Sequence, residues 1–346
     1  MAASSERSFF RHPMAKFALV VLALFALWFG GWFAFASYAD GKLAEAVENV
    51  DQRGIRIDCE NRSIRGFPFR IGVHCDSLSV AHKRDVFRFE LGSIRTAAQL
   101  YAPGELVAEI EAPLKTWPNG VELNADWSFL RLFLDANLTG GFELASLNIG
   151  DFKTTLKTIA INVAKGALHF RPTPVEGETE APVSLDGALS LDSLTANLPS
   201  LVIPEASFQA DGTLEDGYRD LVLQGRPFRA VMKDGAVFDI RNIALSLPDG
   251  GKLAFSGPLE LDEEGLLTGK ISVGVANPQS LSDWAGKIDQ RLAQQIGFIT
   301  QAVAGMGKPK RFGNDDLQSI VVTITKGEVS LGFLKMPEPI PPLFRN

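Results

Sequence analysis

The chain has 346 residues, of which 46% are hydrophobic and 22% are charged. A chain of this length and composition can bury a substantial core, which excludes a disordered protein. The net charge of -7 and the isoelectric point near 5.3 argue against a nucleic-acid partner, because binding to phosphates depends on clustered Lys and Arg.

The N-terminus carries a signal for membrane insertion. Arg7, Arg11 and Lys16 precede residues 17–39, an apolar run that contains no charged residue. A bilayer requires about 20 apolar residues, and the positive flank stays on the cytoplasmic side. We therefore expect a cytoplasmic segment at residues 1–16, a single-pass inner-membrane anchor at 17–39 and an exported, periplasmic part at 40–346.

A cleaved signal peptide is the alternative interpretation of the same run. Ala34, Phe35 and Ala36 offer a small-residue cleavage pattern, although the run is longer than the 7–15 residues usual for a signal peptide. Both interpretations place the rest of the chain outside the cytosol.

The two cysteines, Cys59 and Cys75, stand 16 positions apart in the part of the chain expected to be exported. An oxidising compartment favours a disulfide between them. Alternating apolar residues precede each cysteine, which predicts two strands paired through residues 61–68. A closed loop of about 15 residues contributes about 3 kcal/mol to stability. In the stretch GFPF before the second strand, we expect Phe67 and Phe69 to fill the core.

Period-two alternation dominates the remaining chain and predicts antiparallel hairpins. One hairpin joins residues 253–261 to 267–275 across the acidic turn at 262–265. A second lies near the C-terminus, where Ile320, Val322 and Ile324 are followed by alternating Val329, Leu331 and Phe333. Similar alternation occurs at residues 183–191, 221–223 and 243–247.

Three helices are expected besides the anchor helix. Residues 42–50 continue the anchor as an amphipathic segment, and a short helix is predicted at 127–134. The clearest spans residues 281–304, where apolar residues step by three or four. It either packs on the sheet as core or forms a movable lid.

The predicted fold class is mainly β: a transmembrane helix, then curved antiparallel sheet carrying one long amphipathic helix. The polar, proline-containing connector at residues 172–182 is compatible with two lobes, at about 40–177 and 178–346, or with one elongated curved sheet.

Four segments carry a family resemblance: GFPFR with a following cysteine, the anchored N-terminus, the hairpin of residues 257–277, and the ending at 326–343. Together they resemble the DUF2125 family of alphaproteobacterial envelope proteins. The phrase of strand, acidic turn, Gly and strand also resembles AsmA-like proteins, in which inner-membrane anchors carry β-sheets with an apolar groove associated with phospholipid movement. The DUF2125 resemblance implies no established activity, cofactor or catalytic residue.

Known enzyme signatures are missing from the sequence. The motifs GxSxG, HExxH, GxxxxGK[ST] and CxxC do not occur, and the four histidines are scattered. We therefore predict no catalytic residues, no metal site and no cofactor, and a non-enzymatic protein. A site assembled from distant residues would escape such a search, so a hydrolase is kept as a third hypothesis.

Two functional hypotheses follow from the predicted fold. In the first, the apolar face of the sheet binds or passes lipid, such as phospholipid, or another apolar ligand. Its candidate groove residues, which an ordinary closed core would equally contain, are Phe255, Leu259, Leu267, Ile271, Val273 and Leu331, with Trp284 and Ile288 covering them. In the second, the sheet closes on itself, and an exposed edge or the C-terminal tail docks an envelope protein partner by strand addition.

Overall fold

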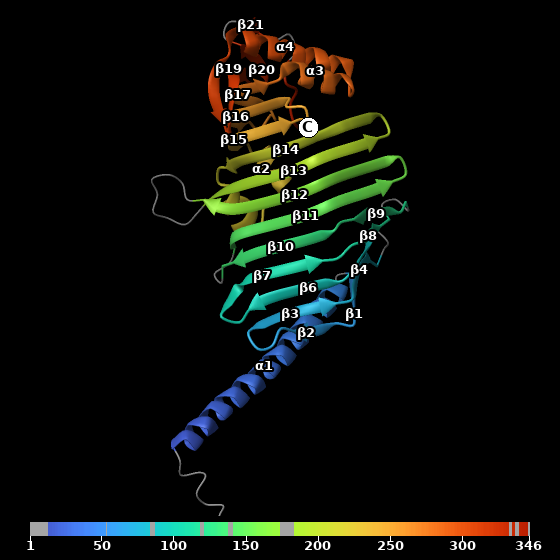
Figure 1. Cartoon of the computed structure of the whole chain (residues 1–346), viewed down its shortest axis with the longest axis vertical. Coiled ribbons are helices and arrows are strands. Elements are labelled where there is room, and N and C mark those ends of the chain that lie inside the picture. Colours follow the sequence, from blue (N-terminus) through green and yellow to red (C-terminus); the bar gives the residue numbers. More distant parts are fainter. Residues whose placement is uncertain are drawn as a thin grey trace, which may run out of the picture.

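A computed structural model gives the fold of the whole chain (Figure 1). The residues it describes are 13–52, 54–83, 87–117, 121–137, 141–173, 183–331, 334–335 and 339–344. Among these, one long N-terminal helix leads into a single antiparallel sheet of 21 strands.

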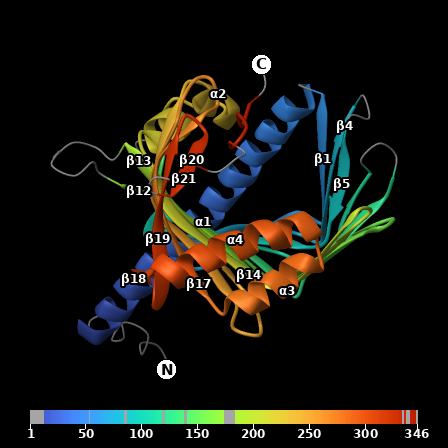
Figure 2. The same ribbon diagram turned by 90° about the horizontal axis from the view of Figure 1, so that it is seen from above.

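Helix α1 (Pro13–Gln52) contains the expected membrane anchor and continues beyond it. Residues Lys16–Gln52 are long and apolar enough to cross a membrane, which a signal sequence would also satisfy. The described side chains from Met14 to Gly31 are exposed, whereas Trp32 and Ala36 are buried. The predicted amphipathic continuation at residues 42–50 is confirmed, and the C-terminal end of α1 lies beside β1 (Figures 1 and 2).

The sheet is antiparallel throughout, and from β10 to β17 each strand pairs with the next strand in the sequence. The η3–α2 segment, formed by η3 (Tyr218–Leu223) and α2 (Phe228–Lys233), connects β14 to β15, and helices α3 (Pro278–Gly286) and α4 (Gln290–Met306) lie between β17 and β18. This confirms the mainly β class and the antiparallel hairpins expected from period-two alternation. The strands are β1 (Ile55–Glu60), β2 (Ser63–Arg65), β3 (Arg70–Cys75), β4 (Ser77–His82), β5 (Arg88–Leu91), β6 (Ile94–Gln99), β7 (Ala102–Ile110), β8 (Leu114–Thr116), β9 (Leu123–Asp126), β10 (Phe129–Ala136), β11 (Phe142–Leu156), β12 (Ile159–Thr173), β13 (Ser184–Leu198), β14 (Leu201–Leu214), β15 (Ala236–Ser246), β16 (Lys252–Leu261), β17 (Leu267–Ala276), β18 (Lys308–Phe312), β19 (Asp315–Thr325), β20 (Glu328–Leu331) and β21 (Leu334–Lys335).

The first ten strands are five long strands, each broken at a corner. On one side of the corner, β2, β3, β6, β7, β10 and β11 pair in that order. On the other side, β1, β4, β5, β8, β9 and β11 pair in that order. The sheet is therefore folded along a line, and it has a trough-like cross-section when seen from above (Figure 2).

Close backbone packing marks this corner. A Cβ atom at Gly92, between β5 and β6, would lie 2.5 Å from the carbonyl oxygens of Glu111 and Ala112, so only glycine fits there. The Trp127 indole N–H, in the next bend, donates a hydrogen bond of 2.8 Å to the Ile110 carbonyl oxygen.

The disulfide between Cys59 and Cys75 lies at the same corner, with the two Cα atoms 5.3 Å apart. The predicted cysteine pair is present, but the prediction that the two cysteine-bearing strands pair with each other is wrong. The chain bends after Glu60, so β1 pairs with β4 and the short β2 pairs with β3. The disulfide therefore links β1 to β3, two strands that do not pair with each other.

Two short segments differ from the secondary structure expected from the sequence. Residues 127–134 are mostly strand β10, because alternation places Leu130, Leu132 and Leu134 on one face of the sheet. Residues 221–223 belong to a π-helix, η3 (Tyr218–Leu223), which a short helix, α2 (Phe228–Lys233), follows.

The long helix predicted at residues 281–304 is two helices, α3 (Pro278–Gly286) and α4 (Gln290–Met306). The Asp289 side chain accepts hydrogen bonds from the amides of Arg291 and Leu292, at 2.6 and 3.1 Å. This N-cap starts a new helix, so the apolar stripe of residues 281–304 is divided between two helices.

Both predicted C-terminal hairpins are present in the structure. Strands β16 and β17 pair across the acidic turn, where the Asp262 carboxylate accepts hydrogen bonds from the amides of Glu264 and Leu266. Strands β19 and β20 form the second hairpin, and Phe333 lies outside the described residues.

The sheet is continuous across the expected connector. Strands β12 and β13 flank it and pair from Thr173 and Ser184 onward. Residues 174–182 of the connector lie outside the described part of the chain.

Candidate apolar binding trough

Apolar side chains form a row across one face of the sheet, each directly opposite the next. At about 4.8 Å between neighbouring strands, the row is about 43 Å long. Parallel rows two residues to either side contain mainly Leu, Ile, Phe, Ala and Gly. The central row consists of Ala108, Leu132, Leu147, Leu168, Leu189, Ala210, Ile243, Phe255, Val273 and Ile320. We call this face the apolar trough.

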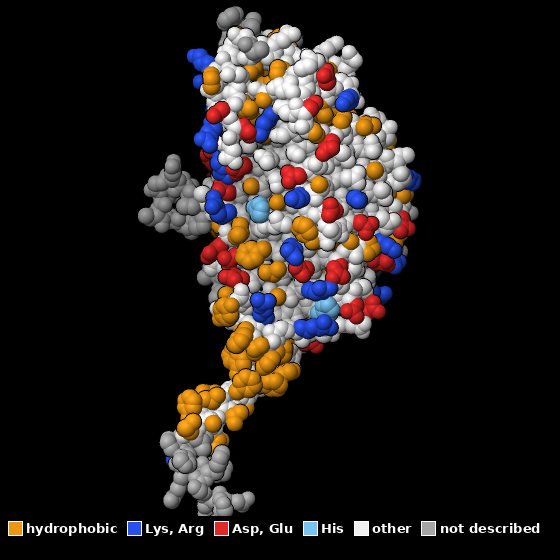
Figure 3. All heavy atoms as spheres, viewed as in Figure 1, with side chains coloured by type: hydrophobic (Ala, Val, Ile, Leu, Met, Phe, Trp, Pro, Cys, Tyr) orange, Lys and Arg blue, Asp and Glu red, His pale blue; other side chains and the backbone are white. Residues whose placement is uncertain are grey.

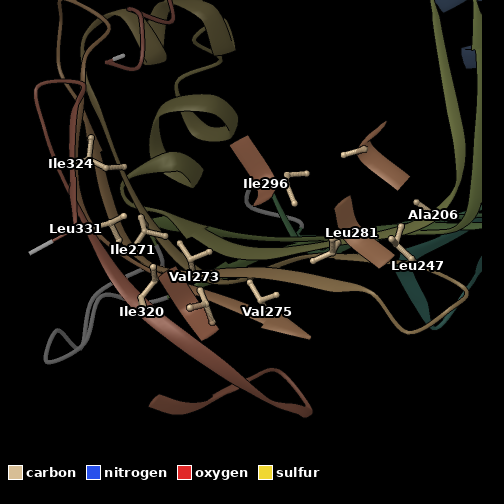
Figure 4. Packing of buried hydrophobic residues seen from close by; sticks show 12 residues of the cluster. Ala206, Leu247, Ile271, Val273, Val275, Leu281, Ile296, Ile320, Ile324 and Leu331 are labelled. Atoms are coloured by element: carbon tan, nitrogen blue, oxygen red, sulfur yellow. The ribbon is translucent and has the colours of Figure 1, made fainter. Parts of the chain in front are cut away.

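The C-terminal end of the trough is filled. Leu281 of α3 and Ile296 of α4 belong to one buried cluster with Val273 and Ile320 of the sheet, and Leu281 lies beside Leu247 (Figure 4). The Trp284 indole N–H donates a hydrogen bond of 3.2 Å to the Pro204 carbonyl oxygen of β14, which ties α3 to the sheet.

Seven of the eight candidate groove residues lie in or against this filled cluster. Ile271, Val273 and Leu331 are buried within it. Four others are partly buried against it: Phe255, Leu259, Leu267 and Trp284. Ile288 lies at the junction between α3 and α4 and is half-buried.

The middle of the trough is open and contains a pocket of about 510 Å³. Leu168 and Leu189 in the central row are half-buried, in contrast to the buried residues at the C-terminal end. The apolar side chains that line the pocket come from β11 to β15 and from the η3–α2 segment: Phe142, Leu168, Phe170, Leu185, Leu189, Leu214, Leu221, Val222, Phe228, Phe238, Ile240 and Ile243.

The η3–α2 segment covers the pocket and is fastened by Tyr218. The buried Tyr218 hydroxyl accepts a hydrogen bond from the Phe142 amide at 2.9 Å and donates one to the Phe142 carbonyl oxygen at 3.0 Å. Within the segment, Arg226 forms ion pairs with Asp220 and Asp234. Phe228 remains 61% exposed, so the cover carries apolar surface to the pocket's rim.

The opposite face of the same strands is polar. Figure 3 shows charged side chains distributed over this face. Asp186 is buried there between β12 and β14, where it accepts hydrogen bonds from Arg171, Thr213 and Arg241 at 2.9, 2.6 and 3.1 Å. Burial acts to raise the pKa of Asp186, but these three hydrogen bonds outweigh it and lower the pKa from 3.8 to about 2.

Phe67 and Phe69 lie in a turn against α1, and the expectation that they fill the core is wrong. Phe67 is 37% exposed and Phe69 is 60% exposed. The ring of Phe67 packs edge-on against Phe29 and Trp32 of the helix, with ring centroids 5.0 and 5.6 Å apart.

Sequence reasoning missed the η3–α2 cover and the position of the pocket. The alternation at residues 221–223 predicted a strand there, and the cover has no sustained helical pattern, because it combines a π-helix with a six-residue α-helix. The signal present was compositional: two apolar groups, residues 221–223 and 230–232, lie between strands within an insertion that also carries several charges.

An unclosed antiparallel sheet with one apolar face, preceded by a long apolar helix consistent with a membrane anchor, defines the class of protein. The chain belongs to the DUF2125 family, described as uncharacterized protein conserved in bacteria, whose sequence model matches residues 32–338. No curated protein and no solved structure matches the chain.

Proposed function

We propose that this protein is an envelope protein, anchored in the inner membrane with its sheet in the periplasm, that binds or passes lipid along the apolar trough. It acts by binding and carries out no chemical step. The observation that supports this proposal most directly is the open, apolar pocket between Leu168, Leu189 and the η3–α2 cover.

The size and lining of the pocket suit an acyl chain. Its volume of about 510 Å³ lies within the roughly 300–1,000 Å³ typical of small-molecule sites. Burying a chain there is favourable by about 0.8 kcal/mol per CH₂ group. The apolar rows continue beyond the pocket toward β7, where Leu106 is 37% exposed, so a chain longer than the pocket remains in contact with hydrocarbon.

The packing of α1 favours a retained anchor over a cleaved signal peptide. Trp32 and Ala36 are only 6% and 7% exposed, and the Trp32 indole N–H donates a hydrogen bond of 2.9 Å to the Arg70 carbonyl oxygen. Cleavage after Ala36 would remove both side chains from the fold. The proposed orientation rests on Arg7, Arg11 and Lys16, which favour a cytoplasmic N-terminus.

The test is photo-crosslinking of the full-length protein in bacterial membranes. The photoreactive residue p-benzoylphenylalanine replaces Phe170, which lines the pocket, or its neighbour His169, which points to the polar face. We expect lipid adducts by mass spectrometry at position 170 and several-fold fewer at 169. Equal yields would contradict lipid binding, and a protein adduct at 170 would favour the adaptor hypothesis.

A matched pair of substitutions adds a control for the face of the sheet. Leu168→Asp places a charge in the trough, whereas Ala167→Asp places the same charge opposite Asn148 and Ser190 on the polar face. Only Leu168→Asp should reduce the lipid adduct at position 170, because a carboxylate in the trough must be desolvated. Circular dichroism of both variants checks that the fold is kept.

A further inference from the structure

The turn formed by residues 66–69 is the part of the sheet in closest contact with the apolar stretch of α1. Two indole groups of the helix bind its backbone: Trp28 donates to the Pro68 carbonyl oxygen at 3.1 Å and Trp32 donates to the Arg70 carbonyl oxygen at 2.9 Å. The Phe69 ring lies 6.2 Å from the Trp28 ring, measured between centroids. The turn is thus fixed to the helix by hydrogen bonds and ring contacts.

The first buried side chain among those described in α1 is Trp32, where the helix meets the turn; Phe33 and Phe35 beyond it are exposed again. The stretch before it, from Met14 to Gly31, is about 26 Å long at 1.5 Å per residue. This length is close to the roughly 30 Å of a hydrocarbon core. Trp28 and Trp32 then lie at its outer boundary, where tryptophan is enriched in membrane proteins. Figure 3 shows hydrophobic side chains gathered where α1 joins the body.

Charged residues around the turn also suit a position at the outer boundary of the bilayer. Arg65 and Arg70 flank it, both are exposed, and neither forms an ion pair with a residue that the structure describes. Further along the helix, Asp40 pairs with Arg62 at 3.0 Å, which places a charged contact on the side of the turn away from the anchor. Arginine pairs readily with the phosphate groups of lipids.

We propose that residues 66–69 form a foot that inserts into the outer leaflet beside α1, with Phe67 and Phe69 among acyl chains and Arg65 and Arg70 at the phosphates. The inference rests on the retained anchor of the proposed function. It gives the sheet a second membrane contact, so the body is held at a defined height and orientation above the bilayer. It does not require lipid in the trough.

The test uses the full-length protein in nanodiscs of phosphatidylethanolamine and phosphatidylglycerol. Single p-benzoylphenylalanine substitutions are made at Phe69, at Leu22 of the anchor, and at Phe298 of α4, which is 49% exposed at the far end of the molecule (Figure 1). After irradiation, we expect lipid adducts at position 69 with a yield similar to that at 22 and several-fold above that at 298.

A yield at position 69 as low as that at 298, with adducts still present at 22, would overturn the foot and leave the anchor standing. Absence of adducts at position 22 would overturn the anchor and the foot together. Failure of lipid binding in the trough is read separately, from position 170.

Discussion

Asp186 links its own strand to three other strands by hydrogen bonds. Its carboxylate lies on β13 and accepts hydrogen bonds from Arg171 on β12, Thr213 on β14 and Arg241 on β15. The pKa of Arg241 is raised, chiefly by its hydrogen bond to Asp211. Burial lowers this pKa, and the hydrogen bond to Asp186 raises it further. The network therefore joins four neighbouring strands on the face opposite the pocket.

Asp186 should make stability depend on pH in an acidic window. Because its folded-state pKa is about 2, below the ordinary 3.8, ionised Asp186 stabilises the fold fully above about pH 4 and loses this effect as the pH falls toward 2. Asp186→Asn should lower the free energy of unfolding at neutral pH by about 2 kcal/mol, since hydrogen bonds to charged groups are lost.

Urea denaturation between pH 2 and pH 7 measures this effect. The difference between wild type and Asp186→Asn should shrink as the pH falls through the window. Asp239→Asn, which changes an exposed carboxylate on β15, should leave the profile unchanged. A difference that is constant with pH would contradict the role of the Asp186 charge.

The disulfide is a second residue-scale determinant. Replacing both Cys59 and Cys75 by Ser should lower the free energy of unfolding by about 3 kcal/mol, because the closed loop of 16 positions constrains the unfolded chain. Thermal denaturation measures the loss. Lipid adducts at position 170 should persist, since the corner lies outside the pocket; their disappearance would show that the corner shapes the trough.

At the scale of elements, Tyr218 is the side chain that joins the cover over the pocket to β11, while Val231 and Met232 anchor α2 in a buried cluster. Tyr218 supplies two hydrogen bonds to the backbone of Phe142, and a Cβ atom at Gly141 would lie 2.0 Å from its hydroxyl oxygen. Nothing else as specific joins η3 to the start of β11 among the described residues.

Tyr218→Phe should loosen this cover while leaving the sheet intact. Two hydrogen bonds to the backbone of the half-buried Phe142 are lost, each worth about 1 kcal/mol. Hydrogen exchange should become about tenfold or more faster in residues 218–233, with little change in β16 and β17. Tyr101→Phe, at a side chain 77% exposed, is the control and should change neither region.

Elements with a strong period were predictable, and those set by single hydrogen bonds were not. The alternation in residues 253–275 predicted β16 and β17, because one face must be apolar and the other polar. The break between α3 and α4 depends on one cap, Asp289, whose hydrogen bonds interrupt a stripe that continues in the sequence. The corner between β1 and β2 likewise was not predicted, and it separates the two cysteine-bearing strands that were expected to pair.

At the scale of the molecule, the trough changes from open to filled along its length. Leu168 and Val273 occupy the same row, yet Leu168 is half-buried and Val273 is 5% exposed. The sequence pattern is the same at both positions. Alternation gives the face of a strand, whereas the coverage of that face depends on distant segments such as α3 and α4, and this is why the pocket could not be placed from the sequence.

Matched aspartate substitutions should separate the two ends of the row. Val273→Asp buries an unpaired carboxylate in a filled core and should destabilise the protein by about 4 kcal/mol or more. Leu168→Asp meets solvent in the open part and should cost far less. Thermal denaturation of both variants measures the contrast, and equal losses would show that the middle of the trough is also closed.

The order of strands in the meander has a consequence for how the protein is made. Since each hairpin pairs with the one synthesised just before it, assembly can proceed from β1 onward without waiting for distant partners. Only β18, which pairs with β19 on the edge away from β17, departs from this order. The growing end exposes a single unpaired strand at each stage, and α3 and α4 are synthesised after β17 and before β18 to β21, the strands that complete the sheet.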